Sequence, residues 1–133
     1  SYRKTRNFGM KKLLFIFFSF TFLNANDIQK AFLVAVYDEN RVENVQHKIK
    51  TDFQYRGEAF FKVAIIGNYN KNVNVITKIN SSNGKLINTE TLYNNLTKKI
   101  YGYELTFRHL DVQKGYFEVF IDGKLYDTKV FVK

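Results

Sequence analysis

Hydrophobic and polar residues alternate along residues 115–133, the pattern of a β-strand that buries one face. The alternation is interrupted only at Asp122-Gly123, a dipeptide suited to a two-residue type I′ turn, because both central residues of that turn need a positive φ. The end of the chain is therefore predicted to be a β-hairpin, which opens at Gly115.

The register of this hairpin follows from a two-residue turn, which places Val119 opposite Tyr126. A three-residue loop would instead turn Asp127 and Lys129 toward the apolar face, so the two-residue turn is preferred. The residues expected on the buried face are Phe117, Val119, Tyr126, Val130 and Val132.

Six further runs of β-type sequence precede the hairpin, separated by turn residues. They are residues 29–38, 47–56, 58–66, 71–80, 85–93 and 100–108. Asn83-Gly84 is a second candidate for a type I′ turn, and the polar, Thr-rich run after it is expected at a sheet edge. No stretch after residue 25 has a helical period. The pattern predicts an all-β fold of about eight strands, either a sandwich or a barrel.

The N-terminal segment has a different character. After Met10, two lysines precede the apolar run Leu13–Leu23, which ends close to Ala25. This is the pattern of a signal peptide, and the run is shorter than the roughly 20 residues that span a bilayer. We expect residues 1–25 to be an upstream extension plus signal peptide that starts at Met10 and is cleaved after Ala25. Residues 26–133 then form the sandwich domain.

The chain has no cysteine, which excludes disulfides, thiolate zinc sites and a lipoprotein anchor. We therefore expect a secreted or periplasmic protein that is not a lipoprotein and has no membrane span after signal removal. Of the 21 Lys and Arg residues, five lie in residues 1–25, which leaves 16 against 12 Asp and Glu. These charges are scattered rather than gathered in a stripe, so nucleic acid is not expected as a partner.

Candidate chemistry is sparse. His47 and His109 have no acid and nucleophile at a suggestive spacing, so no catalytic residue, metal site or cofactor is expected and the protein is predicted not to be an enzyme. Tyr93, Tyr101 and Tyr103 could instead stack on a sugar ring if they are exposed. A carbohydrate-binding module is thus the alternative to a module that binds a protein partner or a cell-envelope component.

The second half of the chain resembles the small exported immunoglobulin-like domains of Bacteroidetes, which include type IX secretion sorting domains. The resemblance rests on the strand, Asn-Gly-Lys turn and strand of residues 73–92, on residues 105–124 and on the terminal KVFVK. It implies an exported, non-enzymatic sandwich of the immunoglobulin- or fibronectin-III-like type, antiparallel and built of about seven or eight strands. We expect such a module to have an envelope or secretion role. Two interpretations stay open: residues 60–133 act as a sorting signal, or the chain forms a stand-alone domain. Phe117 occupies the position of the family's tyrosine, or else Tyr116 takes that position through a shift of one residue in register. Either alternative departs from the family's tyrosine corner.

Overall fold

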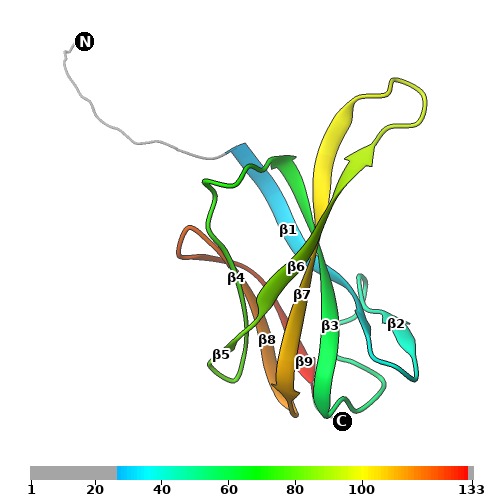
Figure 1. Cartoon of the computed structure of the whole chain (residues 1–133), viewed down its shortest axis with the longest axis vertical. Helices are drawn as coiled ribbons and strands as arrows, with labels where there is room; N and C mark the ends of the chain where they lie inside the picture. The colour runs from blue at the N-terminus through cyan, green and yellow to red at the C-terminus, as the bar shows by residue number, and fades with distance from the viewer. Residues whose placement is uncertain (1–26, 132–133) are drawn as a thin grey trace, which may run out of the picture.

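The computed structural model describes residues 27–131, which contain nine β-strands and no helix (Figure 1). The strands are β1 (Asp27–Tyr37), β2 (Val42–Asn44), β3 (Gly57–Asn68), β4 (Val75–Ile79), β5 (Ser82–Asn83), β6 (Lys85–Tyr93), β7 (Ile100–Val112), β8 (Gly115–Ile121) and β9 (Lys124–Phe131). The predicted signal peptide and Val132 lie outside the described residues, as does the side chain of Val130.

The strands form two antiparallel sheets whose apolar faces meet in one core. The five-stranded sheet has the order β2-β1-β3-β7-β6, and the four-stranded sheet has the order β5-β4-β8-β9. Every pairing is antiparallel. The prediction of an all-β antiparallel sandwich is confirmed.

Aromatic rings join the two sheets at the centre of the core. Phe61 on β3 stacks on Phe117 on β8, with ring centroids 5.0 Å apart and planes inclined by 7°. His109 on β7 meets Phe61 edge to face, at 5.0 Å and 76°. Val63 and Ile65 share the inward face of β3 with Phe61 and are fully buried. The alternation predicted for β3 and β8 is therefore confirmed, because each strand buries one face against the other sheet.

The predicted turn of the closing hairpin is confirmed, since φ is 49° at Asp122 and 85° at Gly123. The second predicted turn is misplaced. The residues with positive φ are Asn80 and Ser81, at 49° and 76°, and Ile79 pairs with Ser82. The chain therefore turns at Asn80-Ser81 and not at Asn83-Gly84.

Gly84 and Gly115 are needed for close packing. A Cβ at Gly84 would collide with the side chains of His109 and Thr77. Gly115 opens β8 as predicted, at a φ of 153°, and the Asn80 side chain lies against it, so a Cβ there would also collide. Glycine is required at both positions because a neighbouring side chain fills the space that a Cβ would occupy.

The predicted register of the β8–β9 hairpin is wrong beyond the turn. A β-bulge at Tyr126 shifts the pairing by one residue, so that Val119 lies opposite Asp127 and Phe117 lies opposite Lys129. Two charged side chains therefore share a face with buried apolar residues. The alternation alone argued against this arrangement, because it counted only contacts within the hairpin.

Asp127 and Lys129 are accommodated because each bonds to a segment outside the hairpin. Asp127 accepts a hydrogen bond from the backbone N–H of Leu33 on β1 at 2.9 Å. Lys129 donates from Nζ to the carbonyl oxygens of Lys48 at 2.6 Å and Gln46 at 3.4 Å, and is only 7% exposed. These two side chains attach β9 to β1 and to the loop after β2, along one open side of the sandwich.

The predicted strand 47–56 forms a loop instead. The buried carboxylate of Glu43 on β2 accepts hydrogen bonds from the Asp52 backbone N–H at 2.7 Å, the Tyr55 hydroxyl at 3.0 Å and Lys48 Nζ at 3.1 Å. Burial, followed by the hydrogen bond to Glu43, raises the pKa of Tyr55, which keeps its hydroxyl a neutral donor. The segment alternates in sequence, but one carboxylate holds it as a compact loop.

Candidate functional site: the β6 edge and the arm

The edges of the two sheets are protected to different degrees. β2 has three residues and β5 has two, so each exposes little backbone. β9 is attached to β1 through Asp127 and to the loop after β2 through Lys129. β6 has nine residues, and among the nine described strands it contacts only β7. Its outer side therefore presents the unpaired N–H and C=O groups of a long edge strand.

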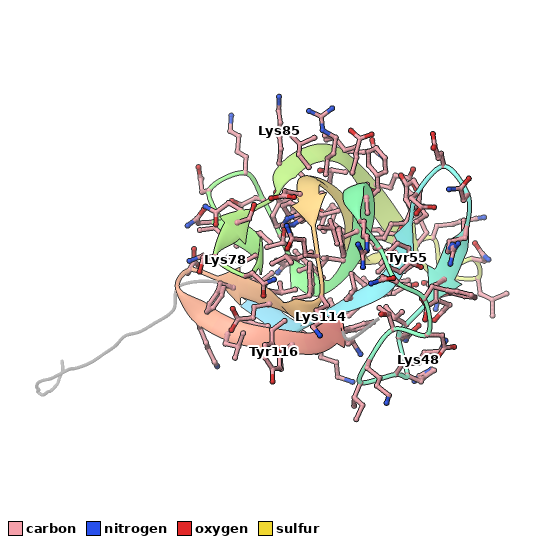
Figure 2. All side chains as sticks on the ribbon, turned by 90° about the horizontal axis from the view of Figure 1, so that it is seen from below. Lys48, Tyr55, Lys78, Lys85, Lys114 and Tyr116 are labelled. Carbon is pink, nitrogen blue, oxygen red and sulfur yellow. The ribbon has the colours of Figure 1, made fainter. Side chains whose placement is uncertain are left out.

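The side chains of β6 are exposed on both faces, except for half-buried Thr91 and Leu92. The exposed residues include the apolar Leu86 and Ile87 near the start of the strand. Figure 2 shows Lys85, the first residue of β6, pointing out to solvent. The prediction of a polar edge strand over residues 85–93 is confirmed.

The hairpin formed by β6 and β7 extends past its neighbours. The pairing of β7 with β3 ends at Gly102, whereas its pairing with β6 continues to Ile100 and Tyr93. Beyond Gly102 the sheet is thus two strands wide, and Figure 1 shows the connecting loop standing away from the body. We call residues 93–101 the arm.

Asn94 closes the tip of the arm through both its backbone and its side chain. Its backbone N–H donates to the Lys99 carbonyl at 2.9 Å, and its own carbonyl accepts from the Lys98 N–H at 2.8 Å. Its side-chain Oδ1 accepts from the backbone N–H groups of Leu96 at 2.9 Å and Thr97 at 3.1 Å. Four hydrogen bonds on one residue define the shape of the tip.

The surface of the arm is apolar and basic. Leu96 is 93% exposed at the tip. Three other large side chains are about half exposed: Tyr93, Ile100 and Tyr101. Lys98 and Lys99 are the charged residues of the arm, and no Asp or Glu occurs between Glu90 and Glu104. The arm therefore gathers exposed apolar side chains with a net positive charge.

The three tyrosines proposed for ligand stacking do not form one platform. Tyr103 is half buried and packs on Tyr69, with ring centroids 5.6 Å apart and planes inclined by 58°. Burial also raises the pKa of Tyr69. Tyr93 and Tyr101 remain exposed on the arm, where Tyr101 also lines a shallow surface hollow shared with residues of β1 and β3. Tyr103 serves core packing, which leaves two tyrosines for recognition.

The two histidines lie in different environments. His47 is exposed in the loop after β2, whereas His109 is buried between the sheets. His109 Nε2 lies 2.9 Å from the Thr77 hydroxyl, while its Nδ1 atom is buried and has no hydrogen-bond partner in the described structure. Burial lowers the pKa of His109 to about 4. The ring is a neutral component of the core, closed to any substrate.

Metal ligands do not gather within residues 27–131, where no group of three or more His, Cys, Asp or Glu residues could hold an ion. In the same part of the chain, no helix is long and apolar enough to cross a membrane. Comparison with known proteins found no matching family model, no matching curated sequence and no matching solved structure. The candidate site is therefore defined by the geometry of the β6 edge and the arm.

Proposed function

We propose that this protein is an exported, non-enzymatic β-sandwich that binds a protein partner by adding a strand to the edge of β6. The observation that carries this proposal is that β6, nine residues long, pairs with β7 alone among the described strands and is exposed along most of its length. In strand addition, backbone hydrogen bonds supply affinity and alternate side chains supply specificity. An edge of this length is long enough for a partner strand of ordinary size.

The distribution of protective features along β6 supports this use. Natural edges are blocked by lysine, proline, bulges or short length. Here Lys85 and a bulge at Ile87 lie at the start of the strand, whereas Asn88–Leu92 pairs regularly with β7 and contains neither lysine nor proline. A partner strand would therefore add along Asn88–Leu92.

An immunoglobulin-like arrangement is part of the proposal. If β1, β3, β4, β6, β7, β8 and β9 are lettered A to G, the sheets have the orders A-B-E-D and C-F-G, which are those of immunoglobulin sandwiches. Phe117, buried near the start of β8, has no hydroxyl, and Tyr116 points away from the sandwich (Figure 2), so the tyrosine corner is absent there.

Export as one unit, residues 26–133, is also proposed. A sorting signal that began at residue 60 would divide β3, which pairs with β1 from Asp27 to Tyr37. In a bacterial host, the exported product should begin at Asn26 and retain Lys133. Phe17→Arg, which places a charge inside the apolar run, should keep the full chain inside the cell. Export of the Phe17→Arg chain would contradict the signal peptide.

Hydrogen exchange tests the strand-addition proposal directly. For a partner isolated from envelope or secreted fractions, the outward amides of Asn88–Leu92 should exchange more slowly in the complex than in the free protein. Neighbouring N–H groups point to opposite sides of a strand, so Thr89→Pro and Glu90→Pro form a matched pair. The variant that loses the N–H pointing to β7 should have a lower melting temperature, because a hydrogen bond to β7 is removed. The variant that loses the outward N–H should keep the wild-type melting temperature and abolish partner binding. Full binding by the stable variant would overturn the proposal.

Carbohydrate binding is a second candidate, favoured by the exposure of Tyr93 and Tyr101 on the arm. Aromatic rings contribute apolar surface to sugar recognition. Glycan-array binding that is lost in Tyr93→Ala and Tyr101→Ala, yet retained in Tyr103→Ala after correction for its lower stability, would favour this function over strand addition.

A further inference from the structure

We propose that the tip of the arm is a membrane-contact site that places Leu96 in the interfacial region of an anionic lipid surface. This contact is distinct from strand addition at β6 and does not depend on it. It uses the end of the hairpin, whereas strand addition uses the outer side of β6 at Asn88–Leu92.

The position of Leu96 is the first argument. Its side chain is 93% exposed, so it adds almost nothing to the core, and Asn94 holds its backbone N–H at 2.9 Å. Single exposed leucines are ordinary on protein surfaces. This one, however, lies in the loop that ends the β6–β7 hairpin, past the point where β7 stops pairing with β3. Figure 1 shows that loop standing away from the body of the sandwich.

The residues around Leu96 form a graded surface. Tyr93, Ile100 and Tyr101 lie behind the tip, each about half exposed. Tyrosine has an apolar ring and a polar hydroxyl, which is why it is enriched where a membrane meets water. The arm therefore has one exposed leucine among polar residues at its tip and tyrosines behind it, so insertion of the leucine would bring the tyrosines to the level of the headgroups.

The positive charge of the arm favours an anionic lipid. Lys98 and Lys99 flank the tip, and no acidic residue occurs between Glu90 and Glu104. A lysine close to an anionic membrane surface gains from its negative potential, and its aliphatic stem can lie along apolar surface. An anionic bilayer thus offers a partner for both properties of the arm: acyl chains for its exposed apolar side chains and negative headgroups for its positive charge.

The shape of the tip favours a bilayer over a protein. Protein interfaces bury apolar side chains in complementary pockets, and such interfaces usually need about 1,000 Å² of buried surface or more. A narrow tip with one protruding leucine offers little flat area, whereas a lipid interface deforms around it. Sugar recognition would use the tyrosines and leave Leu96 without a role.

A dye attached next to Leu96 tests the proposal in the full chain. Because the chain has no cysteine, Asn95→Cys can be labelled at one position with an environment-sensitive fluorophore. With vesicles of phosphatidylcholine and phosphatidylglycerol, emission should shift to shorter wavelength. Adding Leu96→Ser should raise the vesicle concentration for half of this response by about tenfold or more, since a buried leucine side chain is worth that much.

Matched controls separate the arm from the apolar run Leu13–Leu23, which every variant carries. The same dye on Asn40→Cys, an exposed turn position, should not shift. Vesicles of phosphatidylcholine alone, or Lys98→Gln with Lys99→Gln, should weaken the response. No shift at Asn95→Cys, an equal shift at Asn40→Cys, or a shift unchanged by Leu96→Ser would overturn the proposal. Of Thr89→Pro and Glu90→Pro, the variant that keeps the wild-type melting temperature is not expected to affect the response, so the two proposals fail separately.

Discussion

The Nε2 atom of His109 on β7 lies 2.9 Å from the hydroxyl oxygen of Thr77 on β4, and this hydrogen bond joins the two sheets inside the core. Gly84 passes beside the pair, and its N–H donates to the Thr77 carbonyl at 2.9 Å. The chain crosses from one sheet to the other at this point, between β5 and β6. A polar contact between the sheets therefore lies beside this crossover, where His109 and Thr77 leave no room for a Cβ at Gly84.

Acid should destabilise the protein through His109. Burial lowers its folded-state pKa to about 4, while an unfolded histidine titrates near 6.5. Between these values the unfolded chain binds more protons, so stability is complete above pH 6.5 and falls as the pH approaches 4. The free energy of unfolding should drop by about 3 kcal/mol from pH 7 to pH 4 through this residue. Urea unfolding at both pH values measures it.

His109→Gln removes the titrating ring and should flatten the pH dependence by that amount, although it starts from lower stability. Carboxylates titrate in both proteins, so the difference between the two curves isolates His109. Parallel curves for wild type and His109→Gln would contradict the prediction.

Gly84→Ala should destabilise the fold by about 1–3 kcal/mol, since an added methyl group in a packed site forces its neighbours to move. The new Cβ would meet His109 Nε2 and Thr77 Oγ1, and both atoms are held by their shared hydrogen bond. Thermal unfolding measures the effect, with exposed Asn83→Ala as the control. A melting temperature equal to that of Asn83→Ala would show that the crossover can relax.

The strands with one apolar face could be predicted from the sequence, because their partners repeat the same pattern. Phe61, Val63 and Ile65 are buried as their spacing indicates, and they pack against Phe117 and its neighbours on β8. The Asp122-Gly123 turn was also predictable, since positive φ at two successive residues restricts the residue types.

The hairpin register and the loop after β2 could not be predicted, because distant polar partners determine them. Asp127 and Lys129 face inward only because Leu33 and Lys48 supply a backbone donor and a backbone acceptor. The segment around Tyr55 alternates like a strand, but a hydrogen bond from the Tyr55 hydroxyl to the buried Glu43 carboxylate holds it as a loop. Hydrophobic periodicity indicates which side chains are buried. It does not indicate which polar group will form a hydrogen bond with a buried charged side chain.

The candidate site was only partly visible in sequence. Residues 85–93 were predicted as an edge because of their polar composition, which the structure confirms. The arm was missed, since its length depends on where the pairing of β7 with β3 ends, at Gly102. A usable signal did exist: Leu96 stands alone among polar loop residues, and Lys98 follows shortly after it.

Tyr55→Phe should lower the free energy of unfolding by about 1–3 kcal/mol, because the buried Glu43 carboxylate loses one hydrogen-bond donor. The aromatic ring stays in place, so the change reports the hydroxyl rather than packing. Denaturant unfolding measures it. Tyr116→Phe removes an exposed hydroxyl from β8 and should change stability by less than about 0.5 kcal/mol. Equal effects for both variants would mean that water replaces the Tyr55 hydroxyl.

Lys129→Met should destabilise the loop after β2 more than the rest of the sandwich. The substitution keeps the aliphatic stem but leaves the Lys48 and Gln46 carbonyl oxygens without the ammonium donor, at a cost of about 1–3 kcal/mol. Limited trypsin digestion should then cut after Lys48 or Lys50 sooner than in the wild type, since proteolysis follows local opening.

The matched control is Lys71→Met, which removes a lysine from an exposed turn and should leave the digestion pattern at the loop unchanged. Because Lys129 lies on β9 and its acceptors lie in the loop, faster cleavage at the loop would demonstrate coupling between segments about 80 residues apart. If the loop of Lys129→Met resists trypsin as well as that of Lys71→Met, Glu43 alone holds the loop, and the inward-facing charge on β9 serves only the hairpin.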